Sequence, residues 1–180
     1  MDCHAFEGIA APSTRASFVV PGFSGVEAVF QDFNGTCRFD INDIGATVYN
    51  IKLNTQTLDA GIRSGFVKSK TFLNADEFKY LAFDSTHNVV TGKYTMQMHG
   101  ALTIRGVSKP IQWDVSFDPT STQEEVRFLA TVDIDRREWG ITSFENFVSN
   151  TIKITVKGVM APKKNPGPDS AIDQAALSAN

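Results

Sequence analysis

The stretch YTMQMHGALTIRGVSKPIQWDVSF, residues 94–117, decides the fold. In its first arm, 94–104, apolar side chains or glycine hold the even positions; in its second arm, 111–117, apolar side chains hold the odd positions. Because successive side chains of a strand point to opposite faces, each arm has one apolar and one polar face. Residues 105–110 join the arms and contain glycine, serine and proline, which favour a reversal. The stretch therefore predicts a long antiparallel hairpin.

The length of these arms bears on the architecture. At roughly 3.4 Å per residue the first arm spans about 35 Å, whereas the commonest strand has only about 5 or 6 residues. Long, regular strands suit a closed barrel better than a small sandwich, although both remain open. Similar alternation recurs at residues 15–20, 26–30, 36–41, 47–53, 80–86, 126–134 and 152–156. Altogether we expect about eight antiparallel strands, each with one polar face.

The segments between the strands differ in character. We interpret residues 1–13 as an irregular arm, Asn34-Gly35 as a tight turn and residues 88–93 as another turn. From Asp59 to Leu73 the period changes, because Ile62 and Phe66 stand four residues apart. That spacing predicts a short helix or helical turns inserted into the sheet.

Composition sets the class of protein. The chain has 180 residues, 42% of them hydrophobic, and a net charge of -3, which together indicate one globular domain and argue against nucleic acid as a partner. Its 14 phenylalanines predict a very apolar core or an apolar cavity. We assign residues 1–161 to this domain. Residues 162–180 are proline-rich, small and polar, which is typical of a linker or disordered tail.

The sequence contains few signals that indicate a cellular compartment. No stretch is long and apolar enough to be an integral membrane segment. No signal peptide is visible, but the opening MDCHAFEG is typical of a trimmed N-terminus, so we expect a leader in the parent protein. Cys3 and Cys37 could form a disulfide, and the sequence leaves this open because it does not show their separation.

The search for catalytic chemistry is mostly negative. None of the common nucleophile, zinc-protease, phosphate-loop or paired-cysteine motifs is present. His4, His87 and His99 are scattered and do not suggest a metal site, and Glu124-Glu125 is typical of a solvated loop. We therefore expect a binding protein without a catalytic cofactor or metal, and not an enzyme.

Two features could belong to a binding site. The insert carries Arg63, Lys68 and Lys70, which could meet an anionic head group at a barrel mouth or could simply face solvent. Further on, the segment 133–141 ends a strand with Arg136 and then Trp139. This tryptophan could plug one end of a barrel with Arg136 packed across its ring, or it could be an ordinary aromatic cap.

At this point five segments, in order and spacing, resemble the YceI-like family over about residues 16–160. They are VFQDFNGTCRFD (29–40), KSKTFLNADEFKYLAFDST (68–86), residues 94–117 quoted above, DRREWGI (135–141) and SNTIKITVKGV (149–159). The string LTIRGVSKP, 102–110, is close to the family's Leu-Thr-Ile-His-Gly-Val-Thr-Lys-Pro.

The resemblance implies an all-β, eight-stranded antiparallel, lipocalin-like barrel with a short helical insertion. It also implies that the barrel binds a long polyisoprenoid lipid, either an isoprenoid quinone such as ubiquinone or a polyprenyl phosphate, for carriage or sequestration. Family members are typically exported, so the expected location is periplasmic or secreted.

Some positions depart from the family's pattern. Phe66-Val67-Lys68-Ser69 stands where the family commonly has His-Leu-Arg-Ser, Arg105 stands where many members have histidine, and Val20-Pro21 replaces an N-terminal histidine. Fewer polar groups on the insert favour a neutral head group, such as a quinone ring, over a pyrophosphate.

We expect the ligand to contact residues that share the apolar parity of their strands, together with residues of the insert and Trp139. They are Phe18, Phe30, Leu53, Ile62, Arg63, Phe66, Lys68, Phe72, Phe83, Met96, Met98, Leu102, Trp113, Val115, Phe117, Phe128, Val132 and Trp139. The insert should form the mouth, with Arg63 and Lys68 beside the head group. A carrier of fatty acid or another small lipid, and a filled barrel acting as an interaction module, remain alternatives. A membrane or redox partner and a homodimer are also left open.

Overall fold

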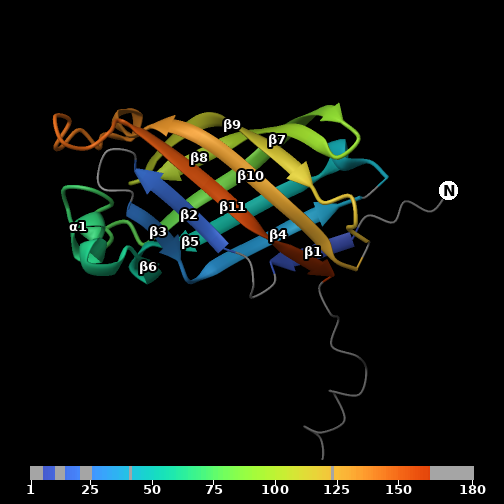
Figure 1. The fold of residues 1–180 in the computed structure, drawn as a ribbon, viewed down its shortest axis with the longest axis horizontal. Helices are drawn as coiled ribbons and strands as arrows, with labels where there is room; N and C mark the ends of the chain where they lie inside the picture. The colour runs from blue at the N-terminus through green and yellow to red at the C-terminus, as the bar shows by residue number, and fades with distance from the viewer. Residues whose placement is uncertain (1–5, 11–14, 21–25, 41, 123, 163–180) are drawn as a thin grey trace, which may run out of the picture.

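The strands of the computed structural model form one antiparallel sheet that curls into a barrel (Figure 1). The structure describes residues 6–10, 15–20, 26–40, 42–122 and 124–162. The strands are β1 (Phe6–Ala10), β2 (Arg15–Val20), β3 (Val26–Phe30), β4 (Phe33–Phe39), β5 (Val48–Asn54), β6 (Leu58–Asp59), β7 (Tyr80–Gly92), β8 (Thr95–Ile104), β9 (Val107–Phe117), β10 (Val126–Asp135) and β11 (Thr151–Pro162). The helical segments are η1 (Ile44–Ala46), η2 (Thr55–Thr57), η3 (Gly61–Arg63), α1 (Ser64–Lys68) and η4 (Arg136–Trp139).

The barrel closes through β1, which pairs with β4 on one side and with β11 on the other. The resulting ring runs β1-β4-β5-β7-β8-β9-β10-β11, while β2, β3 and β6 extend the sheet from β11. The all-β fold with one short α-helix is as predicted, but the expected count of eight strands is too low for the described residues, which hold eleven. The expectation of an irregular arm over residues 1–13 is wrong where β1 lies.

The hairpin of β8 and β9 is paired from Ile104 opposite Val107 to Thr95 opposite Ser116. Its turn is tighter than the expected 105–110. Arg105 and Gly106 alone form it, with φ of 51° and 72°, as a two-residue hairpin with positive φ at both positions requires. Pro110 lies within β9, in a part of that strand that pairs only with β8. This edge position tolerates the missing N–H of proline.

Two other predicted turns are wrong. Asn34 and Gly35 lie within β4, opposite Lys52 and Ile51 of β5, and the chain bends at residues 31–32 instead. Residues 88–92 continue β7, which pairs with β8 through two register shifts. In both places cross-strand pairing outweighs the local preference for a turn.

The insert between β5 and β7 covers one end of the barrel (Figure 1). It comprises η2, β6, η3 and α1, followed by turns up to residue 77. The predicted short helix is confirmed as α1, but it has only five residues and follows a separate 3-10 turn. None of the described helices has the length and apolar character that crossing a bilayer requires.

Gly100 is a position where the fold requires a missing side chain. It is buried on β8, and a Cβ atom there would overlap the carbonyl oxygen of Asp84 and the ring of Phe83. Gly65 of α1 is its opposite, because a Cβ atom there would meet nothing within 4 Å.

We predict that Gly100→Ala lowers the free energy of unfolding by about 1–3 kcal/mol, because the overlap involves backbone and must displace a strand. The matched change Gly65→Ala should leave stability unchanged or raise it by up to about 1 kcal/mol. Urea unfolding followed by circular dichroism measures both. Equal stability of the Gly100 variant and the parent would contradict the close packing described here.

Candidate functional site

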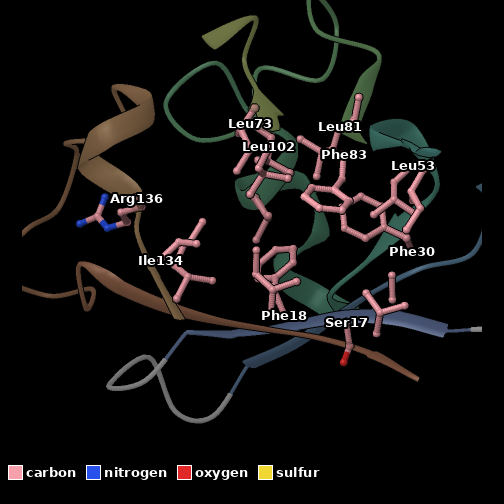
Figure 2. A pocket seen from close by; sticks show the side chains of 18 of the residues that line it. Ser17, Phe18, Phe30, Leu53, Leu73, Leu81, Phe83, Leu102, Ile134 and Arg136 are labelled. Carbon is pink, nitrogen blue, oxygen red and sulfur yellow. The ribbon is translucent and has the colours of Figure 1, made fainter. Parts of the chain in front are cut away.

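A cavity lies inside the barrel beneath the insert (Figure 2). The volume of the cavity is about 70 Å³. The unfilled space is about 840 Å³ when the solvent at its mouth is included. Its walls come from β2, β3, β5, β7, β8, β9, β10 and β11, with the insert and the segment after β10 closing one end. The lining residues are Ala16, Ser17, Phe18, Phe30, Ile51, Leu53, Val67, Phe72, Leu73, Leu81, Ala82, Phe83, Leu102, Ile104, Trp113, Ile134, Arg136, Ile141, Ile152, Ile154 and Val156.

The wall of this cavity is almost entirely hydrocarbon. Among the lining residues only Ser17, Trp113 and Arg136 carry a polar side-chain atom. An enclosed space of this kind favours an apolar ligand, with the few polar groups fixing its orientation.

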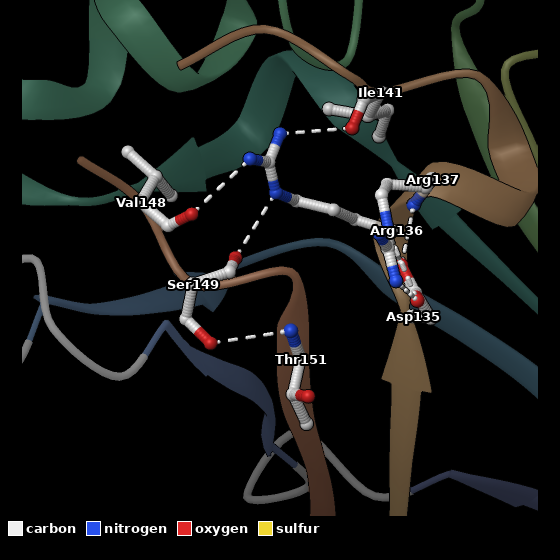
Figure 3. Close-up of polar contacts among 7 residues, drawn as sticks. All are labelled: Asp135, Arg136, Arg137, Ile141, Val148, Ser149 and Thr151. Carbon is white, nitrogen blue, oxygen red and sulfur yellow. Dashed lines mark hydrogen bonds and ion pairs between the residues drawn. The ribbon is translucent and has the colours of Figure 1, made fainter. Parts of the chain in front are cut away.

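The guanidinium of Arg136 is fully buried, and backbone carbonyls surround it (Figure 3). Its Nη1 donates to the carbonyls of Ile141 and Ser143, each at 2.8 Å, its Nη2 to that of Val148 at 3.2 Å and its Nε to that of Ser149 at 3.0 Å. These bonds use four of the five N–H groups of the side chain. The guanidinium therefore holds the 141–149 segment in place and offers little to an anionic ligand.

The charges next to Arg136 differ in exposure. Burial lowers the pKa of Arg136, and the negative charges of Glu145 and Asp135 oppose that shift. Arg137 faces outward, and its hydrogen bonds to Asp135 lower the pKa of that carboxyl to about 2 (Figure 3). The outward pair stays in water, whereas the inward arginine depends on the protein for solvation.

The expected plug of Trp139 and Arg136 takes another form. The guanidinium of Arg136 lies over the ring of Phe72, 5.6 Å from its centroid, and does not stack on Trp139. Trp139 is buried, lies outside the cavity wall, and donates its indole N–H to the carbonyl of Leu102 at 3.1 Å. It fastens η4 to β8, so its role in this structure is to position the cavity wall.

Trp113 differs from Trp139 in its hydrogen bonding. Its ring lines the cavity and stands edge-to-face against Phe83, with the ring centroids 5.7 Å apart. Its indole nitrogen is buried and has no hydrogen-bond partner within the described chain. Buried tryptophans usually find such a partner, so Trp113 is an unused donor at the cavity wall.

The structure divides the expected site residues into three groups. Those on the cavity wall are Phe18, Phe30, Leu53, Phe72, Phe83, Leu102 and Trp113. Those buried in the packed core outside the cavity are Met96, Met98, Val115, Phe117, Phe128 and Trp139, with Val132 half-buried against it. Those on the insert outside the wall are Ile62, Arg63, Phe66 and Lys68.

The packed core fills the barrel away from the insert. Met96 pairs with Val115 at the start of β8, and the rings of Phe39 and Phe117 lie 5.1 Å apart. These residues share the parity of Leu102, and their alternation therefore does not distinguish a filled half from a hollow one. The same parity could have pointed to Ile152, Ile154 and Val156 of β11, which line the cavity and were not expected there.

The insert residues are arranged differently from the expectation. Ile62 is completely exposed, because η3 and α1 do not form one continuous helix in which residues 62 and 66 would share a face. The Nζ of Lys68 donates to the carbonyl of Gln56 at 2.7 Å, which ties α1 to η2. A role for Arg63 and Lys68 at a head group stays a prediction.

Other expectations concern cysteine, metal and the chain ends. Cys37 is buried, but Cys3 lies outside the described residues, so the disulfide stays a prediction. Among the residues that the structure describes, no group of three or more His, Cys, Asp or Glu could hold a metal. His87 and His99 stack on β7 and β8 with ring centroids 4.4 Å apart, and His4 lies outside the described residues. Residues 163–180 of the expected tail also lie outside the described residues, whereas Pro162 is the last residue of β11.

Comparison with known sequences identifies a family. The model of the YceI-like domain matches residues 9–160. A UPF0312 protein of Serratia proteamaculans is 30% identical over 149 residues, covering 78% of this chain and 77% of its own. A UPF0312 protein of Vibrio vulnificus is 27% identical over 145 residues, covering 77% and 76%.

Comparison with solved structures shows the same fold at low identity. BcnA of Burkholderia cenocepacia superposes with a TM-score of 0.75 at 18% identity, covering 82% of this chain and 96% of its own. A polyisoprenoid binding domain of Saccharophagus degradans, implicated in plant cell wall breakdown, superposes with a TM-score of 0.65 at 11% identity, covering 88% and 99%.

We predict that Arg136→Met lowers the free energy of unfolding by at least about 3 kcal/mol, because several carbonyls that now accept from the guanidinium lose their partner. Arg136→Lys should rescue only part of this loss, since one ammonium cannot reach the same spread of acceptors. The control Arg137→Gln, on the exposed neighbour, should have a much smaller effect. Urea unfolding measures stability, and limited proteolysis should show new cleavage within residues 141–149 for the Met variant alone. An Arg136→Met variant as stable as the control would contradict the role assigned to this side chain.

Proposed function

The chain belongs to the YceI-like domain family, and on that premise we propose that it binds a polyisoprenoid lipid with the prenyl chain inside the barrel. The observation that carries the proposal is the cavity itself, which is lined almost entirely by hydrocarbon and covered by a short insert. The work done on the ligand is carriage or sequestration, without chemistry. Following the family resemblance, we place this work in the periplasm or outside the cell.

The energetics suit a slender apolar chain. Each CH₂ group taken from water into such a cavity contributes about 0.8 kcal/mol, before the cost of ordering the chain. The cavity has a small volume, about 70 Å³, which suits a slender prenyl chain better than a broad ring system. A long chain needs more room than the closed cavity offers, and we propose that Phe72 and Leu73 of the insert move outward to admit it.

The polar groups of the wall favour a neutral head group that carries a carbonyl. Trp113 offers an indole N–H without a partner, and a quinone oxygen could accept from it. The one cation of the wall, Arg136, already donates to four backbone carbonyls, whose negative ends would repel a phosphate. We therefore favour an isoprenoid quinone over a polyprenyl phosphate.

The hydrogen bonding of Arg136 also makes a fatty-acid carrier a less favourable alternative. A buried carboxylate requires a positive partner or several hydrogen-bond donors. Arg136 is the one charged side chain on the cavity wall, and its donors are directed to backbone oxygens. A carboxylate in this cavity would thus remain poorly solvated.

Mass spectrometry of a solvent extract of the purified protein tests the ligand class. We expect an isoprenoid quinone at close to one molecule per chain. Finding a polyprenyl phosphate would support polyisoprenoid binding but would contradict our preference for a neutral head group. A fatty acid would support the alternative carrier, and a protein that extracts empty and takes up no quinone on reconstitution would support a filled interaction module.

We predict that Trp113→Phe weakens binding of a prenylated quinone about 3- to 10-fold, because it removes one hydrogen bond while keeping an aromatic wall. Binding of squalene, an isoprenoid hydrocarbon with no acceptor, should change less than about twofold. Equilibrium dialysis with labelled ligands measures both affinities, and circular dichroism confirms that the variant folds. Equal losses for both ligands would mean that Trp113 shapes the wall and donates nothing to the ligand.

A further inference from the structure

A relay of phenylalanine rings leads from the cavity to the protein surface. Phe72 lines the cavity, and the ring of Phe66 on α1 lies 4.9 Å from it, centroid to centroid. Phe144, from the segment after η4, continues the series at 5.4 Å from Phe66. These ring contacts connect the cavity wall with the outside, and they join the two segments that close this end of the barrel.

The outer end of this relay is exposed to solvent. Phe144 is 49% exposed, Phe147 on the same segment is 75% exposed, and Ile62 beside α1 is completely exposed. Single exposed apolar residues are common and need no explanation. Here, however, three large ones belong to the two segments that close this end of the barrel, which favours an interaction surface at this end. We call Ile62, Phe66, Phe144 and Phe147 the apolar rim.

The rim is held outward by the backbone. Phe144 has a φ of 59°, in the left-handed region that bulky residues rarely adopt. Its carbonyl accepts from the backbone N–H groups of Phe147 and Val148, and the carbonyl of Val148 in turn accepts from Arg136. The segment is therefore anchored from inside while its phenylalanines face water. An unfavourable conformation that survives in this way points to a function for the exposed rings.

We propose that the apolar rim docks on the surface of a lipid bilayer and that lipid enters the cavity along the rings of Phe144, Phe66 and Phe72. The inference rests on the proposed function, because a prenyl lipid resides in a bilayer and must leave it without crossing water. The rim offers such a path, since it continues the apolar wall of the cavity. Charge does not favour another partner: apart from the buried Arg136, residues 59–79 and 136–147 together contain five basic and five acidic residues, so contact through hydrocarbon dominates.

The test compares two double variants by co-sedimentation with phosphatidylcholine vesicles. Ile62→Ser with Phe147→Ser removes the two most exposed rim side chains. Val89→Ser with Val90→Ser removes two exposed apolar side chains, 47% and 52% exposed, from the opposite end of β7. We expect the rim variant to lose more than about tenfold in vesicle partitioning, as the loss of two inserted apolar side chains implies. The control should change less than about twofold.

A second measurement separates this inference from the proposed function. Both variants and the parent are titrated in solution, without vesicles, with a quinone whose prenyl chain is short enough to dissolve. Unchanged affinity of the rim variant for this probe, together with slower quinone uptake from vesicles, supports docking. If the parent binds the soluble quinone but does not sediment with vesicles, docking is overturned and the lipid-binding function stands. If the parent does not bind the soluble quinone, the proposed function itself fails.

Two further outcomes would overturn docking. Equal vesicle partitioning of the rim variant and the parent would show that the rim does not insert. A parent that is dimeric by sedimentation velocity and a rim variant that is monomeric, with no difference on vesicles, would assign the rim to a second copy of the chain. A gain-of-signal variant, Phe147→Trp, gives an independent readout, because its emission should shift to the blue on vesicles and be quenched by brominated phosphatidylcholine.

Discussion

The end of the barrel that the insert covers depends on the solvation of one buried guanidinium. Arg136 donates hydrogen bonds to carbonyls spread over residues 141–149, and the face of its guanidinium lies over the ring of Phe72 of the insert. A buried cation without these partners would be strongly unfavourable, so the segment and the insert must both keep their positions relative to η4, which follows β10. One side chain thereby couples the sheet, the covering insert and the wall of the cavity.

The barrel interior is divided into two parts that use the same pattern for different purposes. Away from the insert, methionines and phenylalanines of β8, β9 and β10 belong to one buried core with Phe39, whose ring lies against that of Phe117. Beneath the insert, branched aliphatic residues of β10 and β11 line a cavity. The packed part supplies the stability that allows the other part to remain hollow, because an unfilled apolar space loses the contacts that its walls would otherwise make.

Alternation along the strands could predict the hairpin and the all-β fold, because a half-buried sheet requires it. It could not predict β1, whose pairing depends on β4 and β11 at distant positions in the chain. Nor could it show that Asn34-Gly35 lies in a strand and not in a turn, since pairing with β5 decides that conformation. Within the cavity, parity identifies Leu102 and Trp113 but equally Met96 and Val115, which are packed. Which half stays hollow depends on the insert and on Arg136, and both are set by contacts between segments.

The closure of the ring by β1 has a consequence for how the chain folds. β1 and β11 are the first and last strands of the described chain, and each must wait for the other before the barrel is complete. During synthesis, β1 emerges from the ribosome long before residue 160, and its pairing with β11 cannot form until β11 has emerged as well. Closure of the ring therefore cannot occur before β11 has been synthesised. Until then β10 has an open edge, and a nascent or truncated chain that lacks β11 would be prone to aggregation and in need of a chaperone.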